Sequence, residues 1–191
     1  MKINKSKDKN YRSKIDGFKI LSLKIHKDNR GLFFENYRRN NFIDKKFEFI
    51  QDNISRSKKN VLRGMHYQLE NPQAQLVTVI HGKIFDVVVD LRQKSKTFGC
   101  WSFAILSNTG KYNQVYMEPG LAHGFFVFSD YADLHYKVTN YYDSKNEFGL
   151  IWNDESISIN WPIKKPILSK KDKTHPSFGE LMNKFLPRVK I

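Results

Sequence analysis

The chain has almost no cysteine, since Cys100 is the only one among its 191 residues. A single cysteine cannot form an internal disulfide framework. No apolar run approaches the length of about 20 residues that spans a bilayer as a helix. The charged start, Met1–Asn10, also lacks the apolar centre of a signal peptide. These absences predict a cytoplasmic protein with no membrane partner.

Motifs for common cofactors are missing as well. The sequence contains no glycine-rich phosphate loop and no dinucleotide-binding fingerprint. None of its six histidines forms a His-x-His pair, and a metal site needs at least three well-placed ligands. His66 and His123 could supply two, but no third is evident. Cys100 has no visible catalytic partner. The residues favour acid–base chemistry without a metal or another cofactor.

The chain is strongly basic, with a formal net charge of +14. Such a charge is compatible with nucleic acid, an anionic lipid surface or an anionic small substrate. The lysines and arginines are spread along the chain, and no aromatic–basic RNA motif accompanies them. We therefore expect a solvated basic surface rather than a nucleic-acid partner, and a phosphate-bearing substrate would benefit from its field.

The pattern of apolar residues predicts an all-β protein. The 15 Phe and 9 Tyr favour strands, and short apolar segments recur from Gly17 onwards with turn signals between them. This spacing is typical of a sandwich, jelly roll or barrel. The expected strands are Phe18–Ile25, Leu32–Tyr37, Phe47–Ile54, Asn60–Gln68, Gln75–Ile80, Lys83–Leu91, Trp101–Leu106, Asn113–Glu118, His123–Phe128 and Asp133–Thr139.

The two ends of the chain are less regular. Residues 1–16 are polar and read as a mobile tail or a loosely docked arm, followed by one domain over residues 17–191. The segment Asn153–Pro162 looks extended, and Phe178–Phe185 is compatible with a short helix ended by Pro187. Within the barrel, Ile84–Leu91 alternates between a wholly apolar face and a mixed face that includes Asp86 and Asp90.

Two segments carry residues suited to chemistry: Val61–Gln68 and Glu118–Phe125. On a regular strand, Arg63 and His66 would face opposite sides, but a bulge or bend at Gly64 would turn both towards one cavity. His123 follows a Pro-Gly turn and begins an apolar strand. Taken singly, each of these residues is as compatible with a core histidine or a surface charge as with a site.

Many segments together resemble the dTDP-4-dehydrorhamnose 3,5-epimerase family of nucleotide-sugar epimerases. The resemblance runs from about Gly17 to about Asp172. It implies a cupin-type jelly-roll barrel with a few short helices near the C-terminus, a homodimer, no metal, and a nucleoside-diphosphate 4-keto-6-deoxy sugar as substrate. The matching segments are Asp28–Glu35, Gln51–Ser55, Val61–Gln68, Asp86–Arg92, Ser95–Gly99, Pro119–Phe125, Tyr136–Tyr142, Trp152–Asp154 and Leu168–Asp172.

The resemblance also implies roles for individual residues. His66 matches the base that removes a proton next to the ketone, Asp172 its orienting carboxylate, and Tyr136 the proton donor on the opposite side of the sugar. Other positions match residues that contact the substrate, with Arg30 and Glu35 near the dimer interface and Arg30 placed to reach a neighbouring active site. The expected substrate-binding residues are Arg30, Glu35, Gln51, Asn53, Arg63, Gln75, His123 and Tyr142.

One of these positions departs from the family pattern. Gln75 stands where the family typically has a lysine that helps hold the enolate charge. Glutamine can donate a hydrogen bond to an oxyanion but brings no positive charge. The substitution leaves alternatives open: a slower 3,5-epimerase, an epimerase of one carbon only, a 3,4-ketoisomerase for a related sugar nucleotide, or a cupin that binds the sugar nucleotide without converting it.

Overall fold

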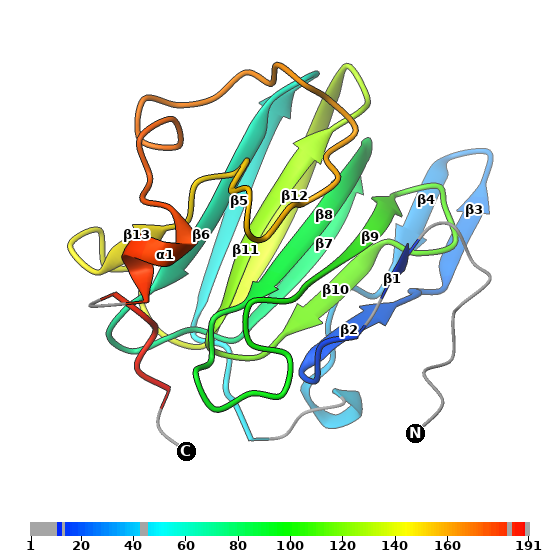
Figure 1. Ribbon diagram of the computed structural model, residues 1–191. Coiled ribbons are helices and arrows are strands. Elements are labelled where there is room, and N and C mark those ends of the chain that lie inside the picture. Colours follow the sequence, from blue (N-terminus) through cyan, green and yellow to red (C-terminus); the bar gives the residue numbers. More distant parts are fainter. Residues whose placement is uncertain (1–10, 13, 43–45, 183–184, 190–191) are drawn as a thin grey trace.

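Two antiparallel sheets face each other and form a barrel (Figure 1). The computed structural model describes residues 11–12, 14–42, 46–182 and 185–189. The first sheet contains, in spatial order, β1 (Tyr11–Arg12), β9 (Trp101–Ser107), β8 (Lys83–Asp90), β11 (Leu121–Val127), β6 (Leu62–Gln68) and β13 (Glu147–Gly149). The second contains β2 (Phe18–Leu21), β10 (Gln114–Met117), β7 (Gln75–His81), β12 (Tyr131–Val138) and β5 (Gln51–Lys58). The expected all-β jelly-roll fold is confirmed.

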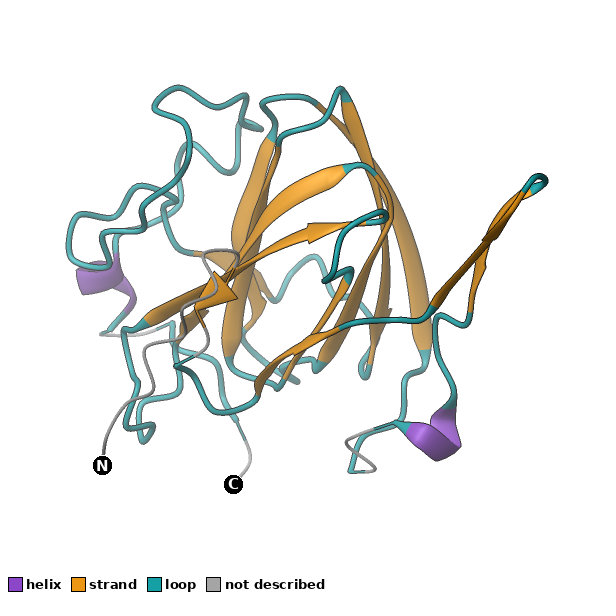
Figure 2. Cartoon of the chain, turned by 90° about the vertical axis from the view of Figure 1, so that its right-hand side faces the viewer, coloured by secondary structure: helices purple, strands orange, loops and turns teal. Residues whose placement is uncertain are grey.

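A separate hairpin extends away from the barrel, as Figure 2 shows. It consists of β3 (Ile25–Asp28) and β4 (Gly31–Phe34), which pair with each other and form their own two-stranded sheet. A 3₁₀-helix, η1 (Arg39–Asn41), follows before the chain enters β5. The structure differs here from the two strands predicted at Phe18–Ile25 and Leu32–Tyr37. The turn Asp28–Gly31 connects two short strands, β3 and β4, rather than two long ones.

Alternation along β8 produces two cores, one on each face of the first sheet. Ile84 and Val88 belong to the core inside the barrel, whereas Phe85 and Val87 belong to a second core on the outer face. The alternation predicted for Ile84–Leu91 is therefore confirmed. Asp86 and Asp90 lie on the inner face and are both fully buried.

The C-terminal segment forms the cover over the outer core. Leu150, Ile157 and Leu181 are buried against the outer face of the first sheet. The predicted extended segment Asn153–Pro162 is not a strand, because the carboxylate of Asp154 accepts hydrogen bonds from the backbone of Ser156 and Ile157 and holds a turn there. The helix α1 is shorter than predicted: it spans Phe178–Leu181, and residues 183–184 lie outside the described residues.

The N-terminal segment is tied to the barrel where the structure describes it. β1 pairs with β9, and residues 1–10 of the predicted tail lie outside the described residues.

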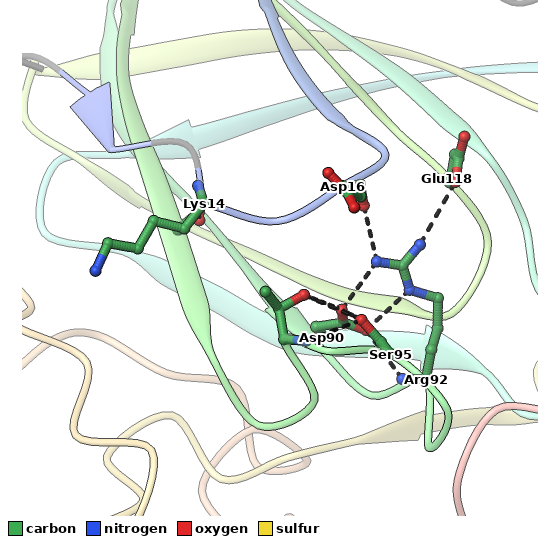
Figure 3. A network of polar contacts seen from close by, with 8 residues as sticks. Lys14, Asp16, Asp90, Arg92, Ser95 and Glu118 are labelled. Atoms are coloured by element: carbon green, nitrogen blue, oxygen red, sulfur yellow. Dashed lines mark hydrogen bonds and ion pairs between the residues drawn. The ribbon is translucent and has the colours of Figure 1, made fainter. Parts of the chain in front are cut away.

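Figure 3 shows Arg92 between the side chains of Asp90 and Glu118 and the main chain of Asp16. Burial opposes ionisation of Asp90, but hydrogen bonds from Arg92, Ser95 and Thr97 outweigh it and lower the pKa of that carboxyl. This network joins the end of β8 to Asp16 and to Glu118, which directly follows β10. Among the described residues, no helix is long and apolar enough to cross a membrane.

Candidate active site

A bulge in β6 directs Arg63 and His66 into one cavity. Opposite β11, His66 pairs with His123 and Arg63 pairs with Phe125, so three residues on β6 span two on β11. The extra residue reverses the alternation, as predicted for Gly64. Gly64 has a φ of 125°, and a Cβ at this position would lie 2.5 Å from Gly124 Cα. The two glycines therefore allow the strands to approach where the bulge occurs.

The cavity lies between the two sheets and has a volume of about 260 Å³. His66 and His123 reach it from the first sheet, and Tyr136 reaches it from β12 in the second sheet. It is lined by seven of the residues predicted from the sequence: Asn53, Arg63, His66, Gln75, His123, Tyr136 and Tyr142.

Asp172 lies behind His66 rather than on the cavity wall. Its Oδ1 is 2.6 Å from His66 Nε2, and the carboxylate is only 3% exposed. Burial raises the pKa of Asp172, but contacts with His175, His66 and Ser169 outweigh it and hold the pKa well below its usual range. An ionised carboxylate can only accept a hydrogen bond, so His66 Nε2 carries the hydrogen. The lone pair of His66 is then on Nδ1, as a base requires.

The C-terminal segment brings Asp172 to this position. Ile167 donates from its backbone N to Asn60 O and accepts from Leu62 N, so the segment runs alongside the start of β6. The backbone N of Asp172 then donates a hydrogen bond to Ser169 Oγ at 3.0 Å. The predicted pair of His66 and Asp172 is thus formed by two segments 106 residues apart in sequence.

Tyr136 is held as a neutral phenol. Its hydroxyl lies 2.9 Å from Ser55 Oγ. Burial raises the pKa of Tyr136 to about 12, although Ser55 and the nearby Arg63 favour the ionised form. A phenol with this pKa is protonated at neutral pH and can act as a proton donor.

His123 has a carboxylate of its own. Its Nε2 lies 2.8 Å from Asp86 Oδ2, and Asp86 is completely buried. Burial raises the pKa of Asp86, whereas His123 favours its ionised form. The other oxygen, Oδ1, has no hydrogen-bond partner among the described residues. Because each histidine is paired with a different carboxylate, His66 and His123 do not form the two-histidine metal site that the sequence left open.

Three predicted residues are linked at the rim of the cavity. Gln51 donates through Nε2 to Asn53 Oδ1 and accepts from the backbone N of Tyr142, both at 2.9 Å. The Tyr142 hydroxyl also lies 3.3 Å from Glu147 Oε2. Gln51 itself is not a lining residue, so it supports the rim rather than the cavity wall.

Gln75 lies at the start of β7 and lines the cavity, at the place where the resemblance puts a cation. Its side chain makes no hydrogen bond to any other residue that the structure describes. The nearest guanidinium in the lining set is Arg63, whose Nε donates to Ser57 Oγ at 2.8 Å. The cavity therefore has one positively charged lining residue where the family pattern supplies two.

Arg30 and Glu35 do not line the cavity of their own chain, as far as the described residues go. Arg30 is at the tip of the projecting hairpin and binds Asp28, and Glu35 binds Arg38. The Arg30 side chain is 85% exposed. These two residues are the part of the predicted site that a single chain does not bring together.

Several residues of the site were missed by the sequence analysis. Ser55 and Ser57 alternate with Asn53 on β5, so a period of two along this strand was a signal for them. His175 is remote from its partners in sequence, and no local pattern indicates it. Asp86 was placed on the mixed face of its strand, but its pairing with His123 was not predicted. The other lining residues that were missed are Tyr67, Gln68, Gln73, Gly124, Phe125, Val138 and Glu147.

Comparison with known proteins agrees with this geometry. The model of the dTDP-4-dehydrorhamnose 3,5-epimerase family matches residues 12–180. The dTDP-4-dehydrorhamnose 3,5-epimerase of Salmonella typhimurium is 46% identical over 168 residues, which cover 85% of this chain and 91% of that protein.

Solved structures show the same relationship. The 3,5-epimerase of Legionella pneumophila in complex with dTDP-4-keto-L-rhamnose has a TM-score of 0.87 at 40% identity, covering 94% of this chain and 97% of the other. ChmJ, a 3'-monoepimerase from Streptomyces bikiniensis in complex with dTDP-quinovose, has a TM-score of 0.84 at 31% identity, covering 92% and 91%. The cupin-type barrel, its cavity and these matches together establish that the chain belongs to the dTDP-4-dehydrorhamnose 3,5-epimerase family of isomerases.

Proposed function

We propose that the cavity binds a nucleoside-diphosphate 4-keto-6-deoxy sugar, with a dTDP-linked sugar as the first candidate, and epimerises it at C3 and C5. The observation that carries this proposal is the pair formed by His66 on one sheet and the buried Asp172 behind it, with the protonated Tyr136 on the other sheet. A base and an acid on opposite sides of a sugar ring are what inversion at carbon requires.

The reaction proceeds through an enolate. The 4-ketone acidifies the C–H bonds at C3 and C5, and His66 Nδ1 removes the proton while Asp172 accepts the hydrogen bond from Nε2–H. The imidazolium that forms is stabilised by the adjacent carboxylate. Arg63, His123 and Gln75 are the lining donors available to the enolate oxygen. Tyr136 then delivers a proton to the opposite face of the carbon. Solvent takes the proton from His66 and returns one to Tyr136, and the cycle is repeated at the second carbon.

We also propose that two copies of the chain form a homodimer through the hairpin β3–β4. Phe33 on this hairpin is 70% exposed, and Ile54 on the edge strand β5 is 72% exposed. Apolar side chains at these positions are suited to an interface rather than to water. Arg30 of one copy would then extend towards the cavity of the other and meet the diphosphate.

Solvent deuterium exchange tests the reaction. The wild-type chain, incubated in D₂O with dTDP-4-keto-6-deoxyglucose, is expected to place deuterium at C3 and C5, and NMR measures both positions. His66→Ala should lower the exchange rate by about 10²–10⁴-fold, the usual contribution of a positioned base. Exchange at the wild-type rate in His66→Ala would remove this residue from the role of base.

The same spectra separate the other activities. Deuterium at one carbon alone would identify a single-carbon epimerase. Binding of the sugar nucleotide with no exchange in the wild-type chain would mean that the protein binds its ligand without converting it, and the proposed reaction would be wrong.

A further inference from the structure

A second histidine lies against the pair of His66 and Asp172, and the proposed reaction does not use it. His175 Nε2 is 3.4 Å from Asp172 Oδ1, and the two imidazole rings are 5.4 Å apart and nearly perpendicular. The His175 side chain is only 6% exposed, and Nε2 has no hydrogen-bond partner among the described residues. A buried polar atom without a hydrogen bond is unfavourable, so its position calls for an explanation.

The absence of a side chain at Gly149 leaves space for the His175 ring. Gly149 pairs with His66 across β13 and β6, and a Cβ at Gly149 would lie 2.4 Å from His175 Nε2. The main chain beside the ring is fixed by a hydrogen bond from Ile151 N to Pro176 O at 2.9 Å. The ring therefore occupies a defined place next to His66 because residue 149 has no side chain.

The three side chains offer the ligand set of a zinc ion. Their ligand atoms, two imidazole nitrogens and one carboxylate oxygen, all lie within 4.8 Å of one another. A tetrahedral Zn²⁺ with bonds of about 2.0–2.1 Å holds its ligand atoms roughly 3.4 Å apart. The distance between His175 Nε2 and Asp172 Oδ1 already has this value. The contact of 2.6 Å between His66 Nε2 and Asp172 Oδ1 has to lengthen, and the two imidazole nitrogens already lie within 4.8 Å of each other.

We propose that His66, Asp172 and His175 form an inhibitory site for a divalent transition-metal ion, with Zn²⁺ as the probe. The ion takes the lone pair of His66 Nε2, so the imidazole proton moves from Nε2 to Nδ1. Nδ1 then has no lone pair and cannot accept a proton from the sugar. The ion also occupies Asp172, which otherwise stabilises the imidazolium. The inhibitory consequence rests on the proposed epimerase reaction, whereas binding of the ion does not.

Calorimetric titration of the full chain with Zn²⁺ tests the site without any substrate. We expect one ion per chain in the wild type and a dissociation constant at least about tenfold higher in His175→Ala. His81→Ala, which removes an exposed histidine on β7, is the matched control and should bind as the wild type does. Equal affinity in His175→Ala and in the wild type would overturn the proposal.

Absorption of the wild-type chain loaded with Co²⁺ gives a second measurement that needs no variant. Intense visible bands of a four-coordinate ion support the site, and the weak bands of a six-coordinate ion overturn it. Inhibition is measured as the Zn²⁺ concentration that halves deuterium exchange, relative to each variant's own rate without the ion. This concentration should rise at least about tenfold in His175→Ala.

The results distinguish the two proposals. Binding of Zn²⁺ in a chain that shows no exchange would leave the metal site standing and contradict the reaction. Exchange in the wild type without any Zn²⁺ binding would leave the reaction standing and contradict the metal site.

Discussion

Arg63 and His66 face the same cavity although they are three residues apart on one strand. On β11, their partners Phe125 and His123 are only two residues apart. The bulge that absorbs the extra residue depends on the close approach of two glycine main chains. A guanidinium and an imidazole thereby line the same cavity from one strand of the barrel wall.

Gly64→Ala should disturb this arrangement. The new Cβ would meet Gly124 Cα at 2.5 Å, and the positive φ of 125° disfavours any residue with a side chain. Overpacking of this kind costs about 1–3 kcal/mol, which denaturant unfolding can measure, and exchange activity should fall with it. Gly179→Ala, where the Cβ meets nothing within 4 Å, is the matched control. Equal stability of the two variants would contradict the packing role of Gly64.

Tyr136→Phe should separate proton removal from inversion. His66 and Asp172 remain in place, so deuterium exchange should continue, while formation of the inverted product falls by roughly 10²–10⁴-fold. Ser55→Ala removes the hydrogen-bond partner of the phenol but keeps its proton, and we expect a milder loss. An unchanged product ratio in Tyr136→Phe would exclude this residue as the acid.

Gln75→Lys should restore a cation to the cavity wall. If the enolate oxygen lies near residue 75, exchange should become faster by up to about tenfold, which corresponds to about 1.4 kcal/mol of the barrier. Gln73→Lys adds the same charge to another lining residue and tests whether the position matters. The same rate and the same product in Gln75→Lys as in the wild type would show that the glutamine has no catalytic consequence.

Asp86→Asn should change how stability depends on pH. Because burial raises the pKa of Asp86 above its unfolded value of about 3.9, the wild type loses stability as pH rises from about 4 through the folded pKa. The variant has no carboxyl to ionise there, so its free energy of unfolding relative to the wild type should improve with rising pH. Urea titrations at several pH values measure this difference.

Asp90→Asn provides the opposite control. The pKa of Asp90 is lowered, so its contribution to stability is present above about pH 4 and lost as pH falls further. This variant should therefore be most destabilised at neutral pH. The same pH trend in both variants would contradict the assigned directions.

Mixing two impaired variants tests whether Arg30 acts on the neighbouring copy. In a dimer of one Arg30→Ala chain and one His66→Ala chain, the first chain keeps His66 and receives an intact Arg30 from its partner. One cavity of the mixed dimer should then regain wild-type exchange. If Arg30 served its own chain, both cavities would stay impaired, and mixing would restore nothing.

The barrel could be predicted from the sequence because it depends on local alternation of apolar residues, whereas most of the cavity residues were predicted from the family resemblance. Tyr136 and Asn53 are on strands that the apolar pattern predicted, but only the resemblance indicated that they belong to the site. The strand β13 was missed because Glu147–Gly149 is short and carries no alternating pattern.

The partners of the histidines could not be found in this way. Asp86 is 37 residues from His123 in the sequence. Its carboxylate lies on the inner face of β8, where apolar side chains are expected. His175 comes next to His66 only because the C-terminal segment folds back over β6 and Gly149 leaves space for the ring. Such contacts depend on how distant segments pack against each other, and this packing cannot be read from a single sequence.

The C-terminal segment that covers the outer core makes the proposed activity depend on complete folding of the chain. The segment that buries the outer core also carries Asp172. In a chain whose barrel has folded but whose C-terminal segment is undocked, the cavity, Tyr136 and His66 would be present. His66 would lack the carboxylate of Asp172 that orients it. If this segment undocks before the barrel unfolds, deuterium exchange should fail earlier during mild denaturation than any probe of the inner core.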